Sequence, residues 1–332
     1  MTTTTPGRAL GRAFGHGKVI LMGEHAVVYD KPALAAGLSL GLWAEATDGT
    51  GRLTMPAWDL HASIGDGTPQ GRAWTALLKC LDVRDVDVRV DGDLPARAGL
   101  GSSAALAVAV ARAVATARGR DPERAREAAA AAEVVFHGTP SGIDLAAASS
   151  GAVGRFQRGT GWRPIAVLQP MTLCVGLSGC SHDTRAQVES VRRLRERTAA
   201  VGAVFDAFDP LVAAGETALA LGDVDELGRL FDVAHGLLAA LRVSSPELET
   251  LVHGARAAGA VGAKLTGAGG GGAVIALAPG LERDVLARWR AAGFQGFTAK
   301  IGEIGDTGDT GAAAAPRATG DDHGANHPKA TA

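Results

Sequence analysis

The stretch "PARAGLGSSAALAVAVARAVATARG", residues 95–119, joins a glycine-rich turn directly to a long run of helix-forming residues. Gly99 and Gly101 can adopt backbone conformations that other residues avoid, and Ser102 and Ser103 stand where N-cap residues belong. A helix that begins here presents backbone N–H groups without partners inside the helix, two hydroxyls and the positive end of its dipole. The pattern therefore predicts a site for an anion such as a phosphate.

The same turn also fits the GxGxx(G/A) dinucleotide fingerprint, so a dehydrogenase is the natural rival function. That fingerprint belongs to the first strand of a βαβ unit, whereas this turn lies a third of the way along the chain, after the strand-like "VDVRV" and a loop. Gly267–Gly272 also matches the GxGxxG pattern, but it leads into the strand-like "AVIALA" and not into a helix. A Walker A loop fails at Lys18, which is followed by Val19. The contexts disfavour both alternatives.

Length and composition indicate a globular protein of about two domains. The chain has 332 residues, of which 46% are hydrophobic and 20% charged. Its net charge of −2 gives no overall field that would attract nucleic acid or an anionic membrane. Its three cysteines form no CxxC pair, and the start "MTTTTPGRALGRA" has no long apolar segment. We therefore expect a cytoplasmic protein that binds neither nucleic acid nor membrane.

Strand and helix patterns alternate along both halves of the chain, which predicts the α+β class. Asp121 and Ser245 are expected to cap helices, and Pro122 to occupy a first helical position. Strands are expected over 17–23, 25–30, 32–47, 86–94, 151–159, 171–179, 297–302 and, as a pair around a five-glycine loop, within 260–279. Helices are expected after Gly101 and over 71–81, 121–138, 181–198, 209–222, 223–243, 245–259 and 281–293. Residues 305–332 lack apolar periodicity and are expected to form a disordered tail.

Four segments together resemble the motifs of the GHMP kinases, the superfamily that contains galactokinases, homoserine kinases and mevalonate kinases. They are "GHGKVILMGEHAVVY" (15–29), "PARAGLGSSAA" (95–105), "EVVFHGTPSGIDLAAASSGA" (133–152) and "KLTGAGGGGAVI" (264–275). Within the superfamily the chain is most similar to the mevalonate kinases. Phosphomevalonate kinase or another small-molecule kinase of the superfamily is the alternative, and a catalytically silent metabolite sensor is disfavoured because Lys18, Glu133 and Asp144 are all present.

The resemblance implies a two-domain GHMP kinase fold. The N-terminal ATP-binding domain, expected over residues 8–165, would be similar to domain 2 of ribosomal protein S5. The C-terminal domain, expected over 166–304, would be ferredoxin-like, with the active site in the cleft between the two. The partners implied are mevalonate and ATP, and a homodimer is left open.

The implied reaction is ATP-dependent phosphorylation of the C5 hydroxyl of mevalonate, with Mg²⁺ as cofactor, giving 5-phosphomevalonate and ADP. Asp144 would accept the hydroxyl proton beside Lys18, and Ser103 and Glu133 would hold Mg²⁺. This fits the chemistry, because phosphoryl transfer needs neutralised phosphates and a positioned nucleophile, and Mg²⁺ prefers oxygen ligands. The residues implied to bind ATP are Pro95, Gly99, Leu100, Gly101, Ser102, Ser103 and Ala104, and those implied to bind the acceptor are Glu24, His25 and Thr266.

Several of these residues also have ordinary structural explanations. Asp144 could cap the short helix that follows it, His25 could equally be a core histidine, and Thr266 could cap a turn. Standing alone, Lys18 would more often be a surface lysine and Glu133 a solvated helical charge. The order of the four motifs favours the functional roles.

Overall fold

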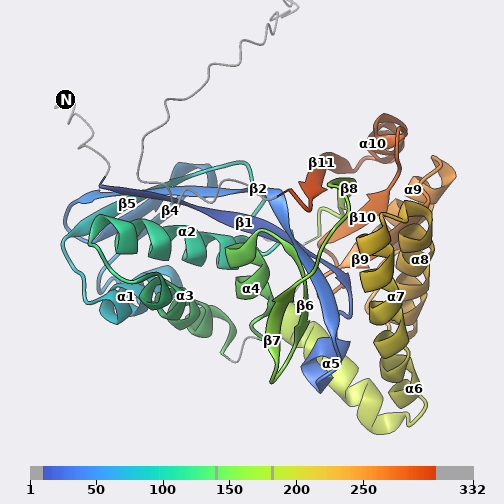
Figure 1. Ribbon diagram of the computed structural model, residues 1–332. Helices are drawn as coiled ribbons and strands as arrows, with labels where there is room; N and C mark the ends of the chain where they lie inside the picture. Colours follow the sequence, from blue (N-terminus) through green and yellow to red (C-terminus); the bar gives the residue numbers. More distant parts are fainter. Residues whose placement is uncertain (1–9, 97, 139–140, 181–182, 304–332) are drawn as a thin grey trace, which may run out of the picture.

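The computed structural model describes residues 10–96, 98–138, 141–180 and 183–303. Within these residues the chain forms two sheets with helices packed on each, so the expected α+β class is confirmed (Figure 1). None of the helices in this part of the chain has the length and apolarity needed to cross a membrane. The tail expected over residues 305–332 lies outside the described residues.

The first sheet is built around the long antiparallel pair β1 and β2. Its strand order is β4-β3-β5-β2-β6-β7, with β1 paired to β2, and its neighbours are antiparallel except for the parallel pair β3 and β5. The strands are β1 (Gly11–Met22), β2 (Ala33–Asp48), β3 (Arg52–Met55), β4 (Leu60–Ser63), β5 (Val86–Asp91), β6 (Val153–Gln157) and β7 (Gly161–Pro164).

Helix α2 packs directly on β1 and β2, and the other helices of this half surround it (Figure 1). The close approach depends on small residues, because a Cβ on Gly15 of β1 would lie 2.0 Å from the carbonyl oxygen of Ala105 in α2. As expected, Asp121 caps α3 by accepting from the N–H of Glu123, and Pro122 is the first helical residue. The helices are α1 (Pro69–Leu81), α2 (Ser102–Ala117), α3 (Pro122–His137) and α4 (Ile143–Ser150).

The second sheet has the order β11-β8-β10-β9 and is antiparallel throughout. In chain order this is 4-1-3-2 with a β-α-β-β-α-β succession, which is the ferredoxin-like arrangement expected, with extra helices in its first crossover. Ser245 caps α9, as expected. The elements are β8 (Met171–Leu177), α5 (Thr184–Arg197), α6 (Val201–Asp206), α7 (Phe208–Leu221), α8 (Val224–Ala240), α9 (Pro246–Ala257), β9 (Gly262–Thr266), β10 (Ala273–Leu277), α10 (Glu282–Ala291) and β11 (Gln295–Ile301).

Two local predictions are wrong. Residues 25–30 were expected to form a strand, but they contain a 3-10 turn, η1 (Ala26–Tyr29), because His25 and Asp30 at its ends have positive φ angles of 59° and 62°. The N-cap of α2 is Gly101, in the left-handed conformation, and not Ser102 or Ser103. Both serines therefore lie inside the first turn of the helix.

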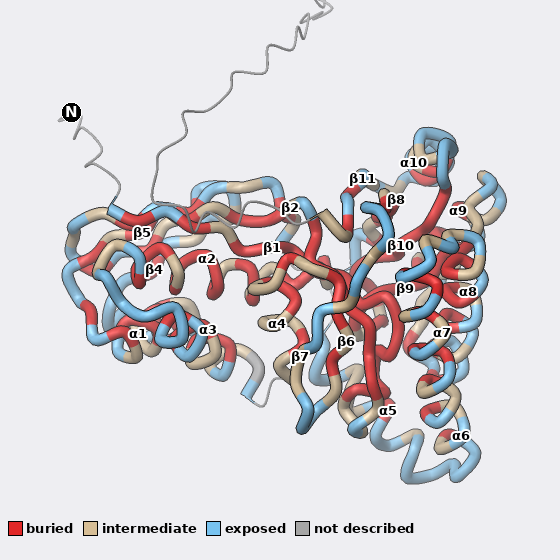
Figure 2. Tube along the Cα trace, in the orientation of Figure 1, coloured by how far each residue is buried: buried red, intermediate tan, exposed pale blue. Residues whose placement is uncertain are grey.

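One hydrophobic cluster of buried residues continues from the first sheet into the second. Figure 2 shows this burial concentrated along β1, β2 and α2 and on the strands of the second sheet. Met22 at the end of β1 packs close to Gly215 of α7, for example, so the two halves share apolar contacts. The division expected between residues 165 and 166 stays a prediction, although β7 ends at Pro164 and β8 begins at Met171.

Candidate active site

A bulge in β1 carries Lys18 to the glycine turn before α2. The pairing of β1 with β2 shifts register between His16 and Lys18, and the backbone N–H of Lys18 donates to the carbonyl of Leu100 at 2.8 Å. A bulge of this kind re-aims a side chain. Gly101 is required here for two reasons, since its φ is +71° and a Cβ on it would lie 2.5 Å from Cγ of Lys18.

Lys18 and Asp144 form an ion pair at the centre of the site, with 3.0 Å between Nζ and Oδ1. The two side chains differ in exposure, because Lys18 is 4% exposed and Asp144 is 41% exposed. Asp144 lies in the first turn of α4, whose N-cap is Gly142 and not Asp144. A buried cation thus reaches a carboxylate that stays accessible to another molecule.

Glu133 on α3 faces the same centre and is 2% exposed. Burial first, and then the charge of Asp144, raise the pKa of Glu133 to about 7, although a hydrogen bond from Ser103 and the charge of Lys18 oppose the rise. The explanation of Glu133 as a solvated helical charge does not hold. A hydroxyl and a carboxylate side by side, next to a second carboxylate, form a set of oxygen donors that suits Mg²⁺, because a cation would stabilise the ionised form of Glu133.

The third glycine segment lies against the first two. A Cβ on Gly267 would come within 3.5 Å of the carbonyl oxygen of Gly99, so the loop after β9 adjoins the turn before α2. The ring of His25 donates from Nε2 to the carbonyl of Ala268 at 2.8 Å, and burial lowers the pKa of this histidine. The neutral imidazole therefore joins the end of β1 to the glycine loop.

Thr266, expected to bind the acceptor, bonds to β1, and Pro95, expected to bind ATP, lies in a loop. The hydroxyl of Thr266 accepts from the N–H of Ile20 at 2.9 Å and donates to its carbonyl at 3.0 Å, which ties β9 to β1. Pro95 is half-buried in the loop between β5 and α2, beside Leu94, whose carbonyl accepts a hydrogen bond from Trp58. The substrate roles of Thr266 and Pro95 stay predictions.

Sequence reasoning missed Lys264, which forms an ion pair with Glu24. Lys264 is 0% exposed and Glu24 is 1% exposed, and the pair links β9 to the end of β1. The Lys264 ammonium also donates to the carbonyls of Leu265 at 2.6 Å and Ile20 at 3.3 Å. A signal was present, since Lys264 is the one charged residue in a strand, "GAKLT", whose five residues are all buried.

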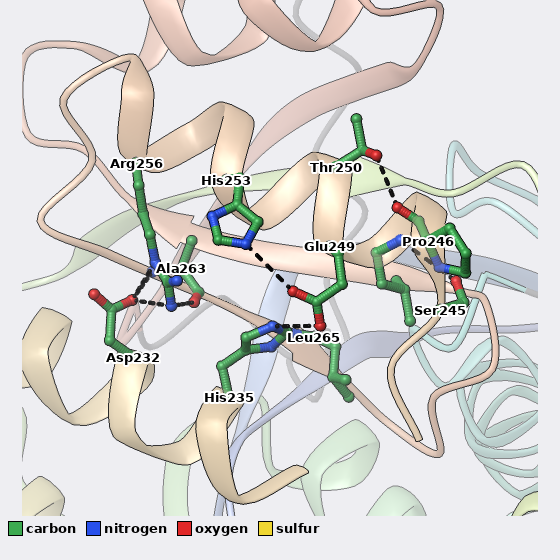
Figure 3. A network of polar contacts seen from close by, with 11 residues as sticks. Asp232, His235, Ser245, Pro246, Glu249, Thr250, His253, Arg256, Ala263 and Leu265 are labelled. Atoms are coloured by element: carbon green, nitrogen blue, oxygen red, sulfur yellow. Dashed lines mark hydrogen bonds and ion pairs between the residues drawn. The ribbon is translucent and has the colours of Figure 1, made fainter. Parts of the chain in front are cut away.

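A polar network holds the other side of β9 to its helices (Figure 3). Oδ1 of Asp232 accepts from the N–H of Ala263 and from Arg256, and Arg256 also donates to the carbonyl of Ala263. His235 accepts from the N–H of Leu265 through Nδ1 and donates to Glu249 through Nε2. The strand that carries Lys264 and Thr266 is therefore fixed by side chains of the two helices packed against it, α8 and α9.

Two family models match the chain. The model described as the GHMP kinase N-terminal domain matches residues 70–152, and the model of the GHMP kinase C-terminal domain matches residues 216–295. The first match covers the glycine turn, Glu133 and Asp144, and the second covers the strand of Lys264 and the glycine loop after it.

Curated relatives and solved structures agree with these matches. A mevalonate kinase of Pyrococcus horikoshii is 36% identical over 306 residues, which cover 83% of this chain and 91% of the relative. A mevalonate kinase of Aeropyrum pernix is 35% identical over 81% of this chain and 89% of its own length. The crystal structure of L. major mevalonate kinase in complex with R-mevalonate is 30% identical, covers 91% of this chain and 98% of its own, and has a TM-score of 0.79.

Proposed function

This chain belongs to the mevalonate kinase family of GHMP kinases, and on that premise we propose that it transfers the γ-phosphoryl group of ATP to the C5 hydroxyl of mevalonate. The observation that carries the proposal is the Lys18–Asp144 pair, with its accessible carboxylate, at the junction of the motifs. ATP is the phosphoryl donor in this family of small-molecule kinases. The products are 5-phosphomevalonate and ADP.

Asp144 acts as the general base in this proposal. As the hydroxyl oxygen forms a bond to the γ-phosphorus, the bond from that phosphorus to the β–γ bridging oxygen breaks, and the hydroxyl proton passes to the Asp144 carboxylate. The Lys18 ammonium, 3.0 Å from the Asp144 carboxylate, stabilises negative charge that develops on the attacking oxygen. Lys18 and Asp144 are already in contact, so neither half of the chain has to move relative to the other to bring them together.

The phosphates are proposed to lie at the start of α2. The first turn of a helix presents N–H groups that its own carbonyls cannot reach, and the dipole adds positive potential there. Gly101 has no side chain that could cap this end, so the position is open to an anion. The residues proposed to surround the phosphates are Pro95, Gly99, Leu100, Gly101, Ser102, Ser103 and Ala104.

Ser103 and Glu133 are proposed to hold Mg²⁺, and Glu24, His25 and Thr266 to bound the acceptor site. The burial of Glu133 and its pKa of about 7 support the metal role, since a carboxylate so close to Asp144 gains from a nearby cation. When bound there, Mg²⁺ would neutralise charge on the β- and γ-phosphates.

The direct test is an assay of ADP release with Mg-ATP and four acceptors, namely mevalonate, phosphomevalonate, homoserine and galactose. We expect clear preference for mevalonate, with the phosphorylated product identified by mass spectrometry. Preference for phosphomevalonate would move the chain to the alternative within the superfamily. ATP binding without transfer to any of the four would support a sensor in place of an enzyme.

A further inference from the structure

The ammonium of Lys264, which pairs with Glu24, is enclosed by protein and cannot meet a substrate directly. The three N–H donors of the Lys264 ammonium are matched by three acceptors, which are Glu24 Oε1 and the carbonyls of Ile20 and Leu265. With 0% exposure and no donor left over, Lys264 can act only through the groups that it contacts. Glu24 is the one charged group among them.

Glu24 has a second oxygen, and a second cation lies within electrostatic range of its carboxylate. Within the described part of the chain, Oε2 of Glu24 is buried and has no hydrogen-bond partner. Burial raises the pKa of Glu24, while the charges of Lys264 and then of Lys18 lower it. Lys18 lies on β1 two residues before Ile20, the residue whose carbonyl Lys264 binds.

The charges of these residues alternate from the interior toward the accessible end of the site. Lys264 is followed by Glu24, then by Lys18, and then by Asp144, which is 41% exposed. Lys18 is itself 4% exposed, and a charge buried to this extent is stabilised by groups of opposite charge around it. Asp144 supplies one such charge at 3.0 Å, and Glu24 supplies another from the interior.

We propose that Lys264 is a positioning residue for phosphoryl transfer: through its bonds to Glu24 and to the carbonyl of Ile20, it holds the Glu24 carboxylate beside the strand that carries Lys18 and so keeps Lys18 directed at Asp144. This inference rests on the proposed function. It assigns Lys264 no contact with substrate. It differs from a purely structural role because it requires the loss of Lys264 to change the chemical step and its pH dependence.

Removal of Lys264 has a definite direction of effect. In Lys264→Met, burial raises the pKa of Glu24 without the opposing ammonium on β9, so Glu24 takes up a proton in a pH range where the wild type is ionised. Besides Lys264, the charge of Lys18 acts on Glu24, and His25, the next residue in the chain, is kept neutral by burial. The acid limb of the kcat profile therefore moves to higher pH, and activity partly recovers as the pH is raised.

The experiment measures kcat, both KM values and the pH profile of kcat for the wild type, Lys264→Met, Glu24→Gln, the double variant and Arg256→Met. Arg256→Met is the matched control, because Arg256 also anchors β9 through an ion pair, with Asp232, but lies outside the site. We expect kcat to fall ~10-fold or more in Lys264→Met, as misplacement of a reacting group does, with KM for ATP little changed. The control should lose thermal stability but keep the kcat profile of the wild type.

The double variant decides the matter even if Lys264→Met does not fold, because it removes both buried charges together. If Lys264 acts through Glu24, the kcat of Glu24→Gln/Lys264→Met equals that of Glu24→Gln. A kcat of the double variant a further tenfold below that of Glu24→Gln would overturn the proposal, because it would give Lys264 a role of its own. A kcat of Lys264→Met near that of the wild type would overturn it too. Wild-type protein that transfers nothing to mevalonate would instead refute the proposed function.

Discussion

The site contains two lysine–carboxylate pairs that share their chemistry and differ in their surroundings. Lys18–Asp144 has a buried cation and a carboxylate that is 41% exposed, whereas both members of Lys264–Glu24 are at most 1% exposed. An accessible carboxylate can exchange a proton with the surrounding solution or a substrate, whereas an enclosed one acts through the groups packed around it. The difference teaches that exposure, and not the pair itself, separates a group that reacts from a group that positions.

The largest effect is expected at the open pair. Asp144→Asn preserves size and removes the proton acceptor, so kcat should fall by ~10² to 10⁴, as it does on loss of a general base. ATP affinity, measured by calorimetry, should persist because the phosphates are proposed to lie mainly at the start of α2. Lys18→Met should also lose most activity, and the double variant should be little worse than the worse single one. A folded Asp144→Asn protein within a few-fold of wild-type turnover would contradict the base role.

Substitutions in the enclosed pair, Lys264–Glu24, should cause the largest losses of stability. Removal of one partner of a buried pair leaves a buried charge without compensation, so Lys264→Met and Glu24→Gln should each lower the free energy of unfolding by ~3–5 kcal/mol. The double variant should recover most of that loss. Chemical denaturation of the three variants checks this, and an additive loss in the double variant would show that the two side chains do not compensate one another.

Glu133 combines features of the two pairs. It is 2% exposed, like the enclosed pair, but it has the charge of Asp144 from the open pair nearby. Its pKa is raised from 4.5 to about 7, so without metal the folded state holds an extra proton between these values and loses stability as the pH rises through them. From about pH 5.5 to about pH 8 this contribution is ~2 kcal/mol, and Glu133→Gln should lack it.

The same variant should raise the Mg²⁺ concentration needed for half-maximal activity, which tests the metal role separately from stability. An unchanged Mg²⁺ titration in a folded Glu133→Gln protein would remove Glu133 from the metal site. The stability difference would remain, because it depends on the burial of Glu133 and on neighbouring protein groups, and not on metal.

The smallest effect is expected at an ion pair whose two side chains are both exposed. Arg12 and Glu45 lie 3.3 Å apart on neighbouring strands, with exposures of 52% and 48%. Solvent screens such a pair, so Glu45→Gln should change the free energy of unfolding by less than ~1 kcal/mol and leave kcat unchanged. A larger loss, measured by the same denaturation, would show that exposure does not rank these pairs.

The local signals in the sequence predicted much of the fold. Hydrophobic periodicity and capping residues gave most helices of both halves, though not α6, and Asp121 and Ser245 cap the helices that they were expected to cap. Residues 25–30 failed because aliphatic and β-branched residues favour a strand, while the positive φ of His25 is set by contacts that the local sequence does not contain. The start of α2 was misjudged by one residue for a similar reason, since Gly101 packs against Lys18.

By itself the sequence determined the family, the α+β class and the order of the four motifs, because these depend on residue type and spacing along the chain. Tertiary structure alone decided which charges meet. Lys18 and Asp144 are 126 residues apart in number and Glu24 and Lys264 are 240, so no local pattern relates them. Their burial was decided with their pairing, because the protein that covers a side chain comes from distant segments, and burial is what distinguishes the enclosed pair from the open one.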